Sequence, residues 1–241
     1  MASRRLSLGL SHTLPRGTHK FDEFCNHGNL REAIEVLDYL QNHGHAIDLI
    51  RLLRLAKLCD RPEVMQEAKF VHERIVSLSH PPDVTSHNAI IEMYSRCGSV
   101  VYAVKVFYEM SEKNTDTWCV MMKCLVRNGY GEEAISLFTR FKQEGNKPDG
   151  EIFKELFSAY ALTGDVKKGS LQFQAMQRDY GIKPSMEHYN SVTKMLAASG
   201  HLEEALSFIE KMPVEPSVDV WETLTLQENI LHTDDIFREI C

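Results

Sequence analysis

The stretch HNAIIEMYSRCGSVVYAVKVFYEM, residues 87–110, has the pattern of two amphipathic helices joined by a short turn. Apolar residues recur at helical spacing on both sides of Gly98: Ile90, Ile91, Tyr94, Val104, Phe107 and Met110. The same skeleton returns at residues 189–212 as YNSVTKMLAASGHLEEALSFIEKM. We therefore expect the chain to repeat a helical hairpin.

A small residue marks the second helix of each expected hairpin. These residues are separated by 35, 35, 31, 35 and 36 positions: Ala33, Ala68, Ala103, Ala134, Gly169 and Ala205. A glycine stands five residues before five of them: Gly28, Gly98, Gly129, Gly164 and Gly200. Larger residues follow four positions after the small residue (Leu37, His72, Phe107, Phe138, Phe173, Ile209) and seven positions after it (Leu40, Ile75, Met110, Phe141, Met176, Met212).

Each position in this pattern has a physical reason. The glycine is expected to end the first helix, because a left-handed residue there is least strained without a Cβ. The small residue lets the second helix approach the first closely, and the larger residues fill the space between hairpins. In the second hairpin Glu63, beside Pro62, replaces the glycine, so the turn of that hairpin is not predicted.

One hairpin of this size cannot bury its own apolar face, but stacked copies can. Sustained alternation of apolar and polar residues, the sign of a half-buried strand, is missing from the sequence. We expect an all-α protein, a right-handed α-solenoid of about six helical hairpins that starts near residue 14.

Composition excludes several classes of protein. The chain has 241 residues, of which 43% are hydrophobic, and no apolar run approaches the roughly 18 residues of a membrane span. Its six cysteines show no C-x-x-C spacing, so we interpret them as reduced, mostly buried thiols of a non-secretory compartment.

Charge is distributed unevenly along the chain. Residues 1–20 contain Arg4, Arg5, Arg16 and Lys20 and no acid, which leaves 23 basic against 34 acidic residues, or −11, for the remainder. An Arg- and Ser-containing, acid-free beginning is typical of an organelle transit peptide; an ordinary basic terminus is the alternative. The acidic remainder argues against non-specific coating of nucleic acid.

Three segments resemble pentatricopeptide repeats of the plant PLS subclass. They are VTSHNAIIEMYSRCGSVVYAVKVFYEMSEKN, TDTWCVMMKCLVRNGYGEEAISLFTRFKQEGNKPD and MEHYNSVTKMLAASGHLEEALSFIEKMPVEPS. That subclass alternates units of about 35, 36 and 31 residues, as the small residues here do. The tetratricopeptide repeat is the alternative. It has a fixed period of about 34 residues and a small residue early in the first helix, where this chain has Ile91, Met122 and Phe157.

The resemblance covers residues 14–217 and implies a division of the chain. Residues 21–83 form two degenerate repeats, followed by an S-type repeat (84–114), a P-type repeat (115–149), an L-type repeat (150–185) and a second S-type repeat (186–217). Residues 218–241 resemble the start of the E extension, without the DYW cytidine-deaminase-like domain that often follows it. An end at Cys241 fits a short form or a truncated gene product.

The resemblance also implies which residues contact RNA. In this family each repeat reads one base through a residue early in its first helix and the last residue of the repeat, as one-base-per-repeat readers do. The implied pairs are Asn88 with Asn114, Cys119 with Asp149, Lys154 with Ser185, and Asn190 with Ser217.

These pairs differ in how well they suit a base. An Asn amide has a donor and an acceptor and can face a pyrimidine edge, whereas Cys is a weak donor. Lys154 is better suited to a phosphate or to solvent. Alternatively, Asn88 and Asn190 only cap the first turns of their helices.

An enzyme is not expected. A zinc deaminase needs H-x-E followed by P-C-x-x-C, and the HLE at residues 201–203 has no such continuation. Cys119 and Cys124 are off the same-face spacing of a helix, and histidines such as His43 and His45 are expected to be solvated. We expect no catalytic residue, no metal and no cofactor.

Two functions fit this sequence. The first is single-stranded RNA binding in organellar RNA metabolism, as an accessory factor in C-to-U editing whose catalysis is supplied in trans. A DYW-type or other editing protein would then bind the C-terminal end, around Trp221, Leu224 and Ile236. The second is a protein-interaction scaffold with incidental RNA contact. The expected compartment is the mitochondrion, with the chloroplast as the alternative, and no membrane partner is expected.

Overall fold

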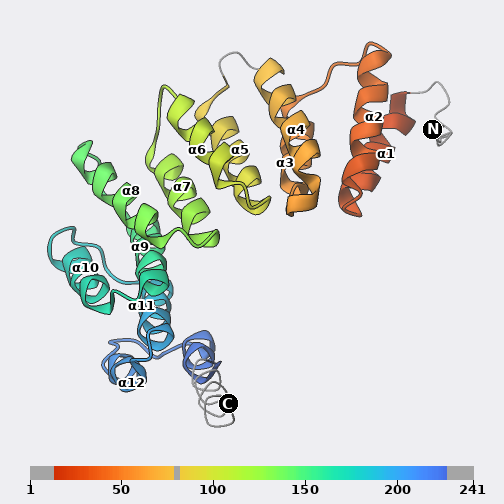
Figure 1. Ribbon diagram of the computed structural model, residues 1–241. Helices are drawn as coiled ribbons and strands as arrows, with labels where there is room; N and C mark the ends of the chain where they lie inside the picture. The colour runs from red at the N-terminus through yellow and green to blue at the C-terminus, as the bar shows by residue number, and fades with distance from the viewer. Residues whose placement is uncertain (1–13, 79–81, 227–241) are drawn as a thin grey trace, which may run out of the picture. The chain divides into compact units, whose positions relative to one another are not determined.

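The computed structural model describes residues 14–78 and 82–226 (Figure 1), and the side chains of this part from residue 19 onward. Every regular element in this part of the chain is helical, which confirms the all-α class. The chain divides into two compact units, unit 1 (Met1–Ser111) and unit 2 (Glu112–Cys241). Each unit is a stack of hairpins.

Unit 1 contains three hairpins, α1–α2, α3–α4 and α5–α6. Consecutive first helices touch, α1 with α3 and α3 with α5, and α2 also packs against α3 and α4 against α5. The elements are α1 (Leu14–Asn26), α2 (Leu30–Asn42), α3 (Leu49–Leu58), the 3-10 turn η1 (Pro62–Val64), α4 (Met65–Leu78), α5 (Val84–Arg96) and α6 (Val100–Glu109).

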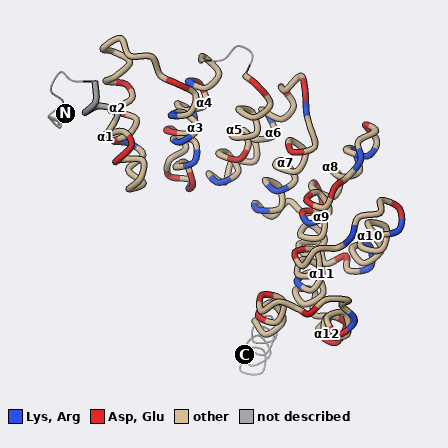
Figure 2. Tube along the Cα trace, turned by 180° about the vertical axis from the view of Figure 1, so that it is seen from behind, with Lys and Arg blue, Asp and Glu red and all other residues tan. Residues whose placement is uncertain are grey.

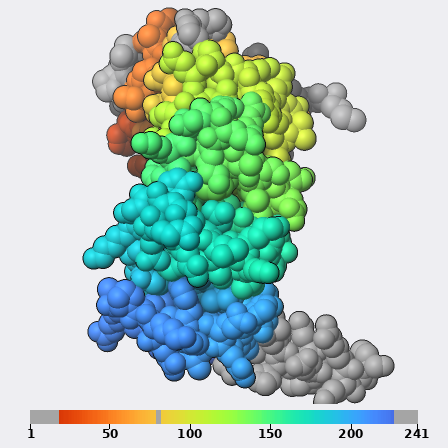
Figure 3. All heavy atoms as spheres, turned by 90° about the vertical axis from the view of Figure 1, so that its left-hand side faces the viewer, coloured from red at the N-terminus to blue at the C-terminus, as the bar shows by residue number. Residues whose placement is uncertain are grey.

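Unit 2 repeats the arrangement with α7–α8, α9–α10 and α11–α12. First helix α9 lies between α7 and α11, and Figure 3 shows the successive hairpins as layers from green to blue. The elements are α7 (Thr115–Arg127), α8 (Gly131–Gln143), α9 (Gly150–Thr163), α10 (Val166–Arg178), α11 (Met186–Ala198) and α12 (Leu202–Glu210). Residues 218–226 are helical as well and follow α12.

The predicted turn glycines have the predicted conformation. All five have positive φ, between 70° and 83°: Gly28, Gly98, Gly129, Gly164 and Gly200. Gly164 ends α9 in the left-handed region, at φ 70° and ψ 9°, and its N–H donates to the Tyr160 carbonyl at 2.9 Å. In the second hairpin, where Glu63 replaces the glycine, η1 makes the connection. Pro62, next to Glu63, is the first residue of this 3-10 turn, a position where its fixed φ and missing N–H are tolerated.

The small residues of the repeat are buried between helices. Each of the five alanines, Ala33, Ala68, Ala103, Ala134 and Ala205, has no exposed surface. The sixth small residue is a glycine, Gly169, because the side chain of an alanine would be too close to its neighbours. A Cβ there would lie 2.1 Å from the Met195 sulfur and 3.2 Å from the Tyr160 Cβ. The repeat therefore brings α10 so close to α9 and α11 that the pattern's usual alanine does not fit without movement of Met195.

Aromatic rings pack within and between the hairpins of unit 2. Phe138 of α8 contacts Phe153 of α9, and Phe157 of α9 contacts Phe173 of α10. Phe173 also contacts rings of α11 and α12. Such pairs contribute about 0.5–1.5 kcal/mol each beyond area burial. Two positions of the pattern, His72 and Met212, are only half-buried.

The described cysteines are free thiols: Cys25, Cys59, Cys97 and Cys124 are buried, and Cys119 is half-buried. Burial raises the pKa of Cys59 to about 12, so its reactive thiolate is scarce at neutral pH. Cys241 lies outside the described residues.

The predicted transit peptide, residues 1–20, falls mostly outside the described part of the chain. Helix α1 begins at Leu14 and pairs with α2, so the last residues of the predicted leader overlap the first helix. The other predicted division points remain predictions. No described helix has both the length and the apolarity needed to cross a membrane.

Candidate nucleic-acid interface

The predicted base-reading residues fall at two positions on the first helices. Those expected early in the helix are each its fifth residue: Asn88 in α5, Cys119 in α7, Lys154 in α9 and Asn190 in α11. Those expected to end a repeat each stand directly before the next first helix: Asn114, Asp149, Ser185 and Ser217. Because the first helices of unit 2 pack side by side, the residues of both sets in this unit lie along the same edge of the stack, at the N-terminal ends of these helices. Asn88 belongs to unit 1 and Asn114 to unit 2.

Three of the repeat-ending residues are helix caps. The Thr117 N–H donates to Asn114 Oδ1 at 2.9 Å, and the Ile152 N–H donates to Asp149 at 3.0 Å. Ser185 forms a capping box with His188. These caps satisfy backbone donors that a helix leaves unpaired at its start. Asn114 and Asp149 are exposed, so the rest of each side chain faces solvent.

Asn88 is not a cap, which makes the alternative structural interpretation of this residue wrong. Helix α5 is capped by Asp83, whose carboxylate accepts from the Ser86 N–H at 2.7 Å. Asn88 is half-buried, and its Oδ1 is buried with no hydrogen-bond partner among the described residues. An unpaired buried acceptor is destabilising by about 1–3 kcal/mol, so local structure does not explain this amide.

Asn190 is not a cap either, because Ser185 caps α11. Its Oδ1 lies 3.0 Å from the hydroxyl oxygen of Thr223, on the helix at residues 218–226. The amide of Asn190 is thus in contact with the next first helix of the stack.

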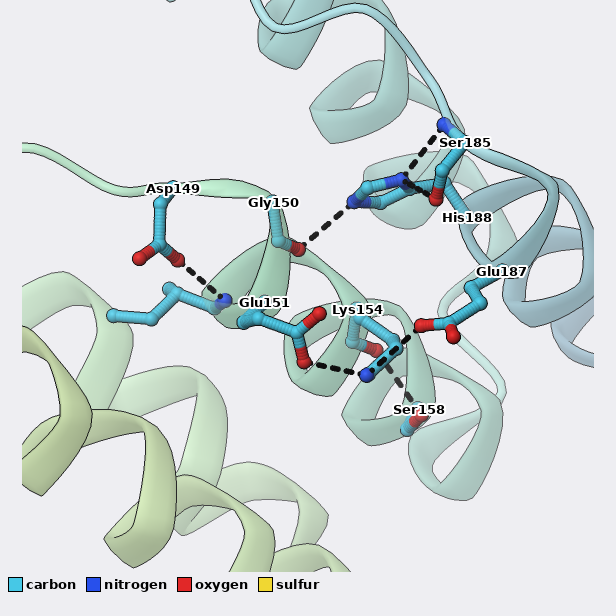
Figure 4. Close-up of polar contacts among 9 residues, drawn as sticks. Asp149, Gly150, Glu151, Lys154, Ser158, Ser185, Glu187 and His188 are labelled. Atoms are coloured by element: carbon cyan, nitrogen blue, oxygen red, sulfur yellow. Dashed lines mark hydrogen bonds and ion pairs between the residues drawn. The ribbon is translucent and has the colours of Figure 1, made fainter.

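Lys154 is held by two carboxylates. Its Nζ lies 2.5 Å from Glu151 of the same helix and 3.1 Å from Glu187 of α11 (Figure 4). Hydrogen bonding to Glu151, and then to Glu187, raises the pKa of Lys154. Its charge is therefore neutralised locally. A phosphate could bind Lys154 only by displacing these carboxylates, and the expectation of a phosphate contact or a solvated side chain does not match this arrangement.

Cys119 lies in acidic surroundings. Burial raises its pKa to about 12, and the charges of Glu155, Asp149 and Glu151 act in the same direction. Burial also raises the pKa of Glu155, which is only 8% exposed. Cys119 therefore offers a neutral thiol, a weak donor, beside carboxyl groups.

His188 is an important residue that the sequence analysis missed. Its Nδ1 accepts from the Ser185 backbone N–H at 3.0 Å, so Nε2 carries the proton and donates to the Gly150 carbonyl at 2.8 Å (Figure 4). A Cβ on Gly150 would lie 3.0 Å from the His188 ring. This contact ties the start of α11 to the start of α9. Its only signal in the sequence is a histidine three residues after a capping serine.

A row of acids runs beside the interface. The second residue of α7, α9, α11 and the helix at residues 218–226 is acidic: Asp116, Glu151, Glu187 and Asp219. An acid in the first turn is favoured by the helix dipole, but the row also places negative charge next to the fifth residues. Figure 2 shows acidic and basic residues mixed along these helices. Among the described residues, no group of His, Cys, Asp and Glu side chains could hold a metal ion.

Two family models match the chain. The PPR repeat model matches residues 21–45, 85–115, 116–146 and 187–215, and the pentatricopeptide repeat domain model matches residues 136–199. Three of the repeat matches begin one residue after the start of a first helix: α5, α7 and α11.

Named relatives come from Arabidopsis thaliana. A mitochondrial pentatricopeptide repeat-containing protein is 70% identical over 204 residues, which cover 85% of this chain and 43% of the relative. Another, also named mitochondrial, is 49% identical over 222 residues, covering 92% of this chain and 41% of the relative. The chain therefore spans less than half the length of these relatives.

Solved structures show the same fold. The pentatricopeptide repeat protein PPR10 from maize has a TM-score of 0.67 at 22% identity, over 90% of this chain and 32% of that protein. PPR10 in complex with an 18-nt psaJ RNA element has a TM-score of 0.70 at 17% identity, over 94% of this chain and 35% of that protein. Repeated helical hairpins, matching repeat models and relatives of high identity lead to one conclusion: the chain belongs to the pentatricopeptide repeat family.

Proposed function

We propose that this protein binds single-stranded RNA in mitochondrial RNA metabolism and reads bases through the fifth residues of its first helices. The observation that carries the proposal is the pair of amides Asn88 and Asn190. They occupy equivalent positions in α5 and α11, and neither is used by a helix cap. An amide that does not cap a helix can present a donor or an acceptor to a base edge.

Similarity to known proteins supports the same proposal. PPR10 has been solved with RNA bound, and two of the named relatives described above are mitochondrial proteins. We extend both properties to this chain, with the chloroplast as the alternative compartment.

Base contacts should contribute more to binding here than phosphate contacts. Lys154 is neutralised by Glu151 and Glu187, and the acidic row lies alongside. Phosphate contacts position a nucleic acid and give binding its salt dependence, whereas base contacts give specificity. We therefore expect weak binding, with a slope of log K against log salt of only about −1 to −2, at about −0.7 for each phosphate contact to a single strand.

Fluorescence anisotropy with short labelled single-stranded RNAs of random sequence tests the proposal. Wild type should bind with a shallow salt slope, and the double variant Asn88→Ala/Asn190→Ala should bind more weakly. Asn42→Ala is the matched control, because Asn42 is an exposed residue at the end of a second helix. Equal binding by wild type and the double variant would contradict base reading by these amides.

We also propose that the protein acts in C-to-U editing as an accessory factor, with a DYW-type or other editing protein supplying catalysis. The partner surface is placed at the helix of residues 218–226. There Val218 is 70% exposed and Trp221 43% exposed, while Leu224 is half-buried. Ile236, also assigned to this surface, lies outside the described residues. Joining a weak RNA-binding chain to a partner that also holds RNA raises the effective concentration of each site.

Affinity purification from plant mitochondria tests this second part. The tagged full chain should recover a deaminase-domain protein, and a chain ending at Ser217 should not. Recovery of the same protein by both chains would remove the C-terminal helix from the proposed interface.

The alternative function is a scaffold that binds proteins through its acidic surface. The observation that favours it is the row Asp116, Glu151, Glu187 and Asp219, which suits a basic protein segment better than RNA. If the scaffold function is the correct one, the anisotropy measurement should detect no RNA binding, while the affinity purification still recovers a partner.

A further inference from the structure

The side chain of Asn190 has one hydrogen-bond partner among the described residues, Thr223. The Thr223 Oγ1 lies 3.0 Å from Asn190 Oδ1 and 2.8 Å from the carbonyl oxygen of Asp219, one turn earlier in its own helix. Both Asn190 and Thr223 are half-buried. The two side chains come from neighbouring first helices of unit 2.

A hydroxyl group has a single proton and cannot donate fully to two oxygens. The carbonyl of Asp219 can only accept, and Thr residues in helices commonly donate to the carbonyl four residues earlier. The Thr223 hydroxyl therefore donates to Asp219 and offers a lone pair to Asn190. The Asn190 amide satisfies that lone pair when it turns by 180°, since its oxygen and nitrogen have nearly the same shape.

We propose that Thr223 is a positioning residue for base recognition by Asn190. The Asn190 Nδ2 donates to Thr223 Oγ1, and this holds the Oδ1 of the same amide turned away from the helix at residues 218–226, where it accepts a hydrogen bond from an RNA base. This inference rests on the proposed RNA-binding function and deepens it. Thr223 lies outside the expected base-reading pairs, yet it determines whether Asn190 offers a donor or an acceptor to the base.

The other two fifth residues of unit 2, Lys154 and Cys119, also interact with the next first helix of the stack. Glu187 of α11 holds Lys154 of α9, and Glu155 of α9 acts on Cys119 of α7. In both cases the partner is a carboxyl group. Thr223 is neutral and leaves one amide atom of Asn190 available, so among the three fifth residues of unit 2 the hairpin of Asn190 is the one suited to base reading.

The experiment is a selection from a random single-stranded RNA library with the full chain, followed by sequencing of the bound RNA. Asn190→Ala identifies the sequence position that Asn190 reads, because its preference should vanish in that variant. Thr223→Val keeps the shape of the side chain and removes the hydroxyl. We expect its preference at that same position to fall by about 2- to 12-fold, the range of one net hydrogen bond, with the other positions unchanged. Thr223→Ser should keep the preference.

Thr225→Val is the matched control. Thr225 is two residues further along the same helix and bonds only to the Trp221 carbonyl, at 2.8 Å, among the described residues. Like Thr223→Val, it deletes a hydroxyl that bonds backbone, but it does not touch Asn190, so its base preferences should match wild type. The melting temperature of every variant is measured by circular dichroism.

The outcomes separate this inference from the function on which it rests. A wild-type chain that selects no sequence overturns both. Loss of one preference in Asn190→Ala but not in Thr223→Val overturns the positioning role alone. A loss spread evenly over all positions in Thr223→Val, with a lowered melting temperature, also overturns it, because it would mean a structural role.

Discussion

Polar side chains at the starts of the first helices fall into two groups, the helix caps and the fifth residues. Asp83, Asn114 and Asp149 accept backbone hydrogen bonds as caps, while the fifth residues lie one turn further along. Asn88 and Asn190 share that fifth position but differ in surroundings. The Oδ1 of Asn88 is buried and unpaired among the described residues, whereas the amide of Asn190 is held by Thr223.

Replacing Asn88 by Thr should change base preference and leave phosphate contacts intact. Threonine is shorter and has one hydroxyl in place of an amide, so it leaves room for a larger base. We expect the preference at one RNA position to shift from pyrimidine towards purine by about two- to tenfold, with an unaltered salt slope. Anisotropy with RNAs that differ at that position measures the change. An equal loss of affinity for every RNA would indicate a structural role for Asn88.

Glu155 should make stability fall as pH rises. Burial raises its pKa above the usual 4.5; Lys123, Lys154 and Arg127 oppose this shift and Glu151 adds to it. Because the folded-state pKa is higher than the unfolded value, the folded protein binds more protons between the two, and stability is lost as pH rises through that interval. Glu155→Gln removes the effect.

The variant should therefore melt at a higher temperature than wild type near pH 7 and at about the same temperature near pH 4. Thermal unfolding followed by circular dichroism across this range measures the difference. Glu210→Gln, at an exposed glutamate that ends α12, should leave the pH dependence unchanged. A pH profile of Glu155→Gln parallel to that of wild type would contradict a raised pKa.

At the scale of the helix, small residues let a second helix pack closely against the first helices beside it. Ala134 of α8 has no exposed surface, and the neighbouring Gly131 is so close to α9 that a Cβ would lie 2.9 Å from Thr163. A helix in this position has no space for a longer side chain. The same constraint explains why every repeat has alanine or glycine at this point.

Replacing Ala134 by Glu should destabilise unit 2 strongly. The new carboxylate would be buried without a partner, which typically destabilises a fold by about 3–5 kcal/mol. Ser136→Glu, two residues along the same helix at an exposed position, should change stability by less than about 0.5 kcal/mol. Urea unfolding measures both. Equal midpoints for the two variants would show that the repeat register is wrong.

At the scale of the whole molecule, each unit is built from contacts between neighbouring hairpins. Such repeat proteins present a row of equivalent positions, and the chemistry at each position can vary without disturbing the fold. In unit 2 the fifth residues of the first helices are a thiol, a neutralised lysine and an amide, and in unit 1 the fifth residue of α5 is another amide.

The purified chain should not convert cytidine to uridine. The sequence offers one H-x-E but no P-C-x-x-C, so the donor set that holds zinc in deaminases is incomplete. Incubation with cytidine-containing single-stranded RNA and zinc, followed by sequencing, should detect no edited base. Addition of the partner recovered from mitochondria should restore editing. Editing by the chain alone would contradict the proposal that another protein supplies catalysis.

The sequence by itself determined the hairpins, their order and the positions of the turn glycines and buried alanines. These features depend on helical periodicity and on contacts that recur in every repeat, so the pattern carries them. It also predicted that the candidate base-reading residues stand early in their first helices, because that depends only on where a helix begins; that they read bases stays a prediction. Where the period breaks, at Pro62 and Glu63, the sequence did not predict the 3-10 turn.

Only the tertiary structure decided what each fifth residue does. The ion pair between Lys154 and Glu187 and the contact between Asn190 and Thr223 each join residues 33 positions apart, and His188 reaches back 38 residues to Gly150. Thr223 and His188 have no counterpart of the same residue type at the equivalent positions of the other first helices of unit 2, so no period reveals them. An acid does recur at the position of Glu187, but only Lys154 is a basic fifth residue that it can pair with. Whether a fifth residue pairs with a carboxylate, contacts a hydroxyl or has no partner among the described residues depends on the neighbouring helix, and that neighbour is defined only when the hairpins stack.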